Sequence, residues 1–217
     1  MLVYAAYLTD WNINDTDFTP LINSLALNGD AIAMAEIPSA LIGTALVIFF
    51  ASLTKNLNLK DYLQLNIPAI VSALKWLAIM GIIIFLMEAS NYLLERKTPD
   101  FMNKVYGSTD NFLLLWLAVI ICAPVFEEFL FRGFLFEGLK HSSAGLTGAI
   151  LISASSWAII HLQYDWYEIF IIFLIGIVFA IAKLKTQSLY IPILMHMFMN
   201  FTASVLMELR TCLEIST

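Results

Sequence analysis

The chain has 217 residues, of which 60% are hydrophobic and 13% are charged, and its net charge is −6. Soluble domains are about 45–50% apolar and about 25% charged. We therefore expect this protein to lie in a lipid bilayer. The 11 basic residues are scattered, which argues against a nucleic-acid-binding surface because such a surface needs clustered Lys and Arg. Two cysteines do not make a disulfide framework.

Apolar segments of nearly spanning length follow one another along the chain. Residues 1–9 are apolar, carry no basic residue and soon meet acidic ones, so we expect a short interfacial segment rather than a signal peptide. A spanning helix needs about 20 mainly apolar residues. Six segments qualify or nearly qualify, at residues 36–54, 68–94, 111–138, 146–161, 166–183 and 188–208. The alternating segments typical of barrel strands are absent, and no linker or repeat divides the chain. We therefore predict an all-α, polytopic transmembrane helical bundle of about six spanning helices, with residues 1–217 forming a single membrane domain.

The charges between these segments favour one orientation. If the N-terminus is outside, the cytoplasmic connectors hold Lys55, Lys60, Lys140, Lys183 and Lys185. The opposite side then holds Arg96, Lys97, Lys104 and Arg210. Five basic residues against four satisfy the positive-inside tendency by a small margin, so we expect the N-terminus outside. This topology puts His161 and His196 near opposite ends of their helices unless a helix breaks or tilts.

Several ionisable side chains lie inside the apolar segments. A charge at the centre of a bilayer costs about 2.5–3.5 kcal/mol on insertion scales, and such residues usually face the interior of the bundle. In a helix, Glu128 and Arg132 are four residues apart and share a face, so we expect them to form an ion pair. Glu127 is rotated about 100° away from Glu128 and needs partners from other helices. Pro124 frees a backbone carbonyl one turn earlier, which a membrane helix tolerates where the freed group lines a cavity.

Candidate partners for Glu127 lie in two other apolar segments. His161 follows Trp157 by four residues, so the indole could wall a pocket and fix the imidazole. His196 and Asn200 are likewise four residues apart and share a helical face. We expect these side chains to meet Glu127 inside the bundle.

These residue types together suit the hydrolysis of an amide bond. A carboxylate and an imidazole can hold a water molecule and deprotonate it as a general base. An imidazole and a carboxamide on one helical face can donate two hydrogen bonds to a developing oxyanion, and losing one such donor typically costs about 3–4 kcal/mol. The prediction is a peptidase site that forms no covalent intermediate and uses no metal or other cofactor.

Three short motifs, in order, resemble those of the CAAX protease and bacteriocin-processing family of intramembrane glutamic endopeptidases, which includes the type II CAAX prenyl endopeptidases. They are Glu127-Glu128-Phe-Leu-Phe-Arg132, Trp157-Ala-Ile-Ile-His161 and His196-Met-Phe-Met-Asn200. The resemblance covers about residues 111–205, the expected catalytic core. Residues 1–110 resemble the family only in being hydrophobic helices.

The resemblance implies a role for each matching residue. Glu127 and His161 would activate the water, and His196 with Asn200 would form the oxyanion site. The pair of Glu128 and Arg132 would support them.

The resemblance also bears on specificity, partners and location. Trp157 stands where Phe is usual in the family, and the larger ring would narrow the pocket. The implied partners are a peptide or membrane-associated protein substrate and the lipid bilayer, without nucleic acid. The implied location is the bacterial cytoplasmic membrane, and no residue indicates whether the substrate is prenylated.

Two alternatives belong to other functional classes. One Glu and two His form a familiar set of three zinc ligands, which would make the protein a zinc-dependent membrane metallopeptidase. Against this, the chain has no His-Glu-x-x-His helix. The other alternative is a non-enzymatic membrane scaffold or a transporter, in which the polar residues form a proton relay. Transporters built from inverted repeats would show hydropathy symmetry between the halves, which is not visible.

Overall fold

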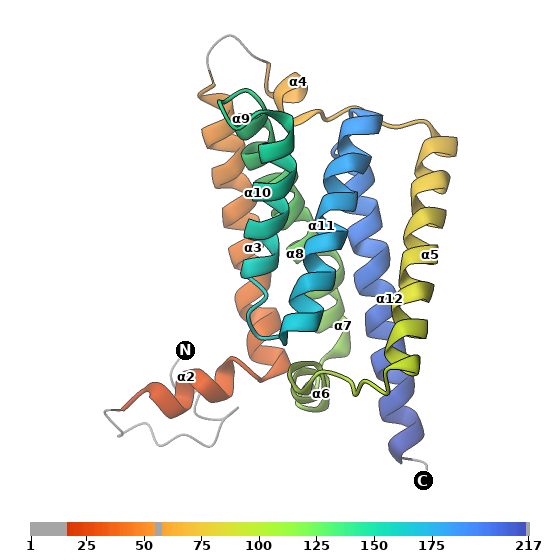
Figure 1. Ribbon diagram of the computed structural model, residues 1–217. Helices are drawn as coiled ribbons and strands as arrows, with labels where there is room; N and C mark the ends of the chain where they lie inside the picture. Colours follow the sequence, from red (N-terminus) through yellow and green to blue (C-terminus); the bar gives the residue numbers. More distant parts are fainter. Residues whose placement is uncertain (1–16, 55–57, 216–217) are drawn as a thin grey trace.

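Helices form every regular element in the part of the chain that the computed structural model describes, residues 17–54 and 58–215 (Figure 1). In chain order the elements are α2 (Thr19–Leu25), α3 (Gly29–Ser52), α4 (Leu59–Leu63), α5 (Ile70–Leu93), α6 (Asp100–Gly107), α7 (Phe112–Trp116), η1 (Leu117–Cys122), α8 (Ala123–Glu128), η2 (Phe129–Leu135), α9 (Phe136–Lys140), α10 (Gly145–Ile159), α11 (Trp166–Thr186) and α12 (Tyr190–Ile215). This confirms the predicted all-α fold. The interfacial segment expected at residues 1–9 lies outside the described residues.

Five helices of the described chain are long and apolar enough to cross a membrane. They are α3, α5, the continuous run Phe112–Lys140, α11 and the Tyr190–Arg210 part of α12. The remaining expected segment, 146–161, forms α10, which has only 15 residues. At 1.5 Å per residue α10 is about 22 Å long, shorter than the roughly 30 Å hydrocarbon core of a bilayer. The five apolar helices make the protein an integral membrane protein. His161 follows α10 in a turn rather than lying within a helix.

Side-chain caps set the beginnings of two spanning helices. The side chain of Asn28 accepts a hydrogen bond from the backbone N–H of Ala31 and so caps α3. Asp165 accepts from the N–H groups of Tyr167 and Glu168 and so caps α11. Such a cap satisfies N–H groups that have no partner within the helix. The Asp165 cap starts α11 directly after the turn that contains His161, which fixes this end of the site.

The run Phe112–Lys140 is a continuous helix with two wider turns. In η1 and η2 the backbone hydrogen bonds reach five residues back, as from the N–H of Ala123 to the carbonyl of Ala118. Pro124 follows the first wide turn and has no N–H to donate. Wide turns of this kind are frequent at functional sites. Glu127 and Glu128 lie in α8, the short segment between the two wide turns.

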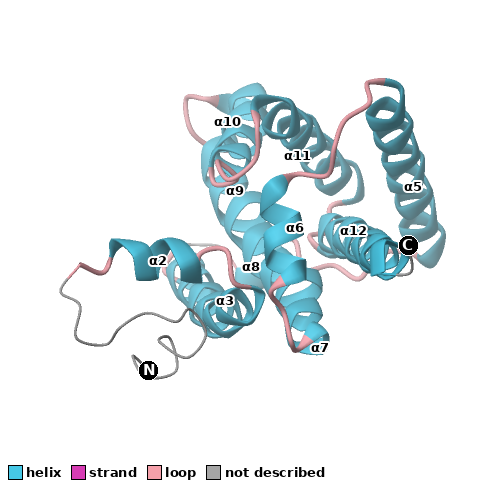
Figure 2. Cartoon of the chain, turned by 90° about the horizontal axis from the view of Figure 1, so that it is seen from below, coloured by secondary structure: helices cyan, strands magenta, loops and turns pink. Residues whose placement is uncertain are grey.

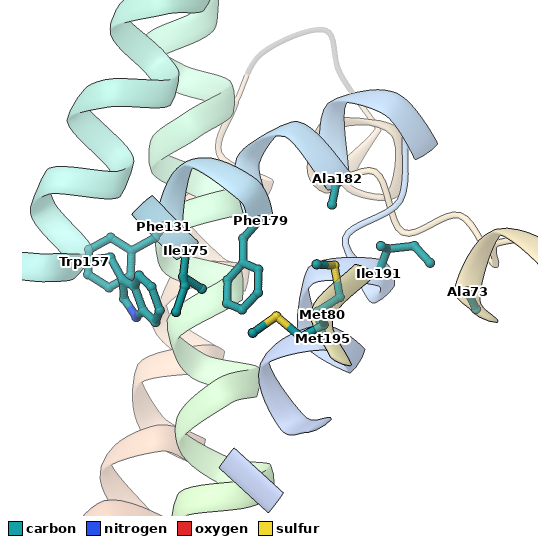
Figure 3. Packing of buried hydrophobic residues seen from close by; sticks show 9 residues of the cluster. All are labelled: Ala73, Met80, Phe131, Trp157, Ile175, Phe179, Ala182, Ile191 and Met195. Atoms are coloured by element: carbon teal, nitrogen blue, oxygen red, sulfur yellow. The ribbon is translucent and has the colours of Figure 1, made fainter. Parts of the chain in front are cut away.

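The largest buried cluster lies where α5, η2, α10, α11 and α12 meet, and Figure 3 shows its side chains. Phe131, Trp157, Phe179 and Met195 are its large members. The close approach of α10 to α11 depends on Gly176, because a Cβ there would lie 3.0 Å from the Cβ of Ala154. Seen along the bundle, α5 lies at the edge (Figure 2), where it packs chiefly against α12.

The sequence alone placed His161 and His196 near opposite ends of their helices. The level at which α12 begins in the bundle explains how His196 nevertheless reaches Glu127. Leu189, just before α12, packs beside Gly133, since a Cβ on that glycine would lie 3.4 Å from Leu189 Cδ2. The neighbouring long helix continues beyond Gly133 to Lys140, so α12 starts about 10 Å inside the end of the bundle at 1.5 Å per residue. Seven residues further along α12, His196 comes level with a residue six positions before Gly133, which is Glu127.

Candidate active site

Glu127 receives its partners from two other helices, as its position on the helix required. Its Oε2 accepts a 2.5 Å hydrogen bond from Nε1 of Trp157 in α10. Nε2 of His196 in α12 lies 4.0 Å from the same oxygen. The Glu127 side chain is 14% exposed, so the carboxylate is largely shielded from the surroundings without being sealed.

Trp157 links two of the predicted site residues. Its indole N–H donates to Glu127, and its backbone carbonyl lies 2.8 Å from Nδ1 of His161. The indole is 1% exposed, and its ring lies 5.3 Å from the His161 ring and 5.2 Å from the His196 ring. Sequence reasoning identified Trp157 as a pocket wall and missed its role as a donor. The available signal was that a buried indole N–H usually needs a hydrogen-bond partner.

The contact with Trp157 fixes the tautomer of His161. A backbone carbonyl can only accept a hydrogen bond, so Nδ1 of His161 carries the proton and donates it to Trp157. The Nε2 atom of a neutral His161 therefore has its lone pair available for a water molecule. The ring is stacked on that of Tyr164, with 6.3 Å between the centroids and 17° between the planes. Tyr164 in turn packs edge-on against Phe101 of α6.

Glu128 has two partners at a single oxygen. Arg132 donates to Oε1 at 3.0 Å, which is the ion pair expected from the four-residue spacing. Nδ1 of His196 lies 3.0 Å from the same Oε1. Both members of the ion pair are completely buried, and Arg132 also donates to the carbonyl of Gly176 and lies over the Trp157 ring. The sequence did not reveal that Glu128 holds His196 as well as Arg132.

The contact with Glu128 also constrains His196. An ionised carboxylate only accepts hydrogen bonds, so Nδ1 of His196 carries a proton and Nε2 faces Glu127. A neutral His196 in this tautomer has only an acceptor at Nε2. To donate from Nε2 to an oxyanion, His196 must carry a proton on both ring nitrogens.

Asn200 is already engaged with the backbone of η1. Its Nδ2 donates a 2.7 Å hydrogen bond to the carbonyl of Val119. In the five-back pattern of η1, the partner of this carbonyl would be the N–H of Pro124, which does not exist. Asn200 thus satisfies the carbonyl that the proline frees. A carboxamide has two N–H hydrogens, so one remains for another acceptor.

Helix α3 adds a carboxylate that sequence reasoning did not single out. Glu36 lies in this spanning helix and is only partly buried, and its charge interacts with that of Glu127. The two helices are in close contact nearby, because a Cβ on Gly43 would overlap the ring of Phe126. An acidic residue within an apolar run was the available signal.

The predicted zinc alternative needs three ligands around one point. Among residues 17–54 and 58–215, no group of three or more His, Cys, Asp or Glu side chains is arranged to hold a metal ion. The Nδ1 atoms of His161 and His196 are taken by Trp157 and Glu128.

Comparison with known proteins supports the family resemblance. A family model described as "Type II CAAX prenyl endopeptidase Rce1-like" matches residues 109–202. An uncharacterized 24.3 kDa protein of Escherichia coli is 28% identical over 139 residues, which cover 62% of this chain and 61% of that protein. The chain therefore spans about three fifths of the length of this curated relative. No solved structure matches the chain. The family match contains all three motifs and confirms the resemblance that they predicted.

Proposed function

We propose that the protein is an intramembrane glutamic endopeptidase, which hydrolyses a peptide bond with a water molecule activated by Glu127 and His161. The observation that carries this proposal is the double contact of Trp157. Trp157 donates to Glu127 through its buried indole N–H and accepts from His161 through its backbone carbonyl. It thereby supports both groups in orientations that suit one water molecule.

The hydrogen bonds suggest which atoms act on the water. Trp157 occupies Oε2 of Glu127, which leaves Oε1 as the proton acceptor. Nε2 of His161 is a second acceptor, since its Nδ1 carries the proton. Glu127 would take a proton from the attacking water and later give it to the leaving amine, as a general base and then a general acid.

The oxyanion would be stabilised from α12. His196, with a proton on both ring nitrogens, would donate from Nε2, and Asn200 would donate the hydrogen that Val119 does not use. Donors held in place before the reaction stabilise the transition state without reorganisation. The pair of Glu128 and Arg132 then serves the chemistry through His196. The substrate would be a peptide or a membrane-associated protein, and the location the bacterial cytoplasmic membrane.

Purified protein in phosphatidylcholine nanodiscs, incubated with a mixture of peptides and analysed by mass spectrometry, tests this proposal. Wild-type protein should cleave a subset of peptides, and Glu127→Gln and His161→Ala should cleave none. Glu88→Gln is the matched control, because Glu88 pairs with Arg210 in an exposed position. Cleavage by Glu127→Gln would refute the glutamic mechanism. Loss of wild-type cleavage with a chelator, restored by zinc, would support the metallopeptidase alternative instead.

A further inference from the structure

A cavity of about 520 Å³ lies between α5 and α11, near the end of the bundle where α5 begins and α11 ends. Trp76, Ile79 and Ile181 give it apolar surface. Its polar lining comes from Ser72, Lys75, Lys185 and Thr186. No residue of the candidate active site lines this cavity, and its lining contains no acidic residue and no histidine.

Both lysines of this cavity lack a counter-ion among the residues that the structure describes. In the described part of the chain, neither Lys75 nor Lys185 lies within ion-pair distance of a carboxylate. Two other lysines near this end of the bundle behave differently, because Lys140 and Lys183 both pair with Glu137. Two unpaired positive charges therefore line one cavity and repel each other unless an anion lies between them.

The level of the cavity along the helices matches that of lipid headgroups. Lys75 is within the first two turns of α5, beside Trp76, and Lys185 is the penultimate residue of α11. Lysine and tryptophan near the ends of spanning helices lie at the membrane interface.

This end of the bundle also collects basic residues. The α4, α9 and α11 ends lie together there (Figure 1). Its described basic residues are Lys60, Lys75, Lys140, Lys183 and Lys185, with Asp61 and Glu137 as acidic ones. By the positive-inside tendency it faces the cytoplasm, where the leaflet is rich in anionic lipids.

We propose that this cavity binds the headgroup of an anionic phospholipid, with the phosphate between Lys75 and Lys185. The hydroxyl of Ser72, which also lines the cavity, would donate to the phosphate or ester oxygens. The acyl chains would lie on the exposed apolar face of α5. Because α5 packs chiefly on α12, the lipid would also join α5 to α11. Two lysines that each contribute about fivefold give about a 25-fold preference over a zwitterionic lipid.

Quenching of Trp76 fluorescence by brominated lipids tests the proposal. Protein in phosphatidylcholine nanodiscs is compared with a minor fraction of brominated phosphatidylglycerol or of brominated phosphatidylcholine, and Trp76→Phe identifies the Trp76 signal. Phosphatidylglycerol should quench Trp76 at a much lower fraction than phosphatidylcholine. The preference should be lost in Lys75→Gln/Lys185→Gln and kept in a control with two lysines near the opposite end replaced, Lys97→Gln/Lys104→Gln.

Three results would overturn the proposal. One is equal quenching of Trp76 by the two lipids in wild-type protein. Another is an unchanged preference in Lys75→Gln/Lys185→Gln. The third is complete suppression of the phosphatidylglycerol preference by millimolar inorganic phosphate, which would assign the cavity to a free anion. Since the assay does not depend on peptide cleavage, its outcome is separate from that of the proposed function.

Discussion

Replacing one member of the buried ion pair of Glu128 and Arg132 should lower the unfolding free energy more than replacing both members. Both side chains are completely buried, and 3.0 Å separates Oε1 from Nη1. Glu128→Met leaves the arginine charge buried without its carboxylate, and Arg132→Met leaves the glutamate charge without its guanidinium. Each single substitution is expected to cost about 3–5 kcal/mol of unfolding free energy, whereas replacing both partners with apolar side chains is often close to neutral. The double variant should therefore be more stable than either single variant.

The double variant should regain stability relative to the single variants, but its kcat should stay low. Glu128 also holds Nδ1 of His196 at 3.0 Å, and the double variant leaves this nitrogen without its carboxylate. Without Glu128, His196 loses the carboxylate that orients its ring. Removal of one oxyanion donor costs about 10²–10³ in kcat, so kcat of the double variant should fall by about this factor. KM should change little, because Glu128 is completely buried and does not touch a substrate.

Unfolding by SDS titration in mixed micelles, together with peptidase kinetics, measures both effects. The matched control is Glu88→Met/Arg210→Met, because that pair is about half exposed at 3.5 Å and exposed pairs contribute only about 0–1 kcal/mol. A double Glu128/Arg132 variant as unstable as the single variants would refute the ion-pair account. A stable double variant with wild-type kcat would refute the role of Glu128 in positioning His196.

Two further substitutions test other contacts. Trp157→Phe removes the N–H that Glu127 accepts but keeps a ring, so kcat should fall about tenfold, the lower end for a hydrogen bond to a charged group. Trp116→Phe is its control, because the buried indole N–H of Trp116 has no partner in the described residues. In ¹⁵N spectra of labelled protein, Glu127→Gln should shift the Trp157 indole signal and leave that of Trp116, and an unmoved Trp157 signal would contradict the contact. Gly29→Ala should destabilise the start of α3 by about 1–3 kcal/mol because its Cβ would overlap Thr109. Gly107→Ala, with open space around it, should have little effect on the melting temperature, and equal effects of the two alanines would refute the close packing at Gly29.

Composition alone was enough to predict a helical membrane bundle, because no soluble surface could be built from so few charged residues. The spacing of Glu128 and Arg132 was enough to predict their ion pair, because that contact lies within one turn of one helix. Contacts between different helices were harder to predict from the sequence. The second bond of Glu128, to His196, joins residues 68 positions apart, and no local pattern reports it.

The depth of α12 was also hidden, because it is set by a distant connector. The N–H of Leu189 donates to the carbonyl of Gln64, and the hydroxyl of Ser188 donates to the carbonyl of Asn66. These bonds hold the start of α12 beside Gly133. A count of residues along each hydrophobic segment assumes that every helix starts at the same level, whereas α12 starts beside Gly133, within the bundle.

The central claim is that Glu127 activates water for the cleavage of peptides in the membrane. Its most direct test is a comparison of the peptide termini in membranes from cells that produce, at equal levels, wild-type protein or Glu127→Gln. The account predicts a set of new termini that occurs with wild-type protein and disappears with Glu127→Gln. The same set of termini with both proteins would contradict it.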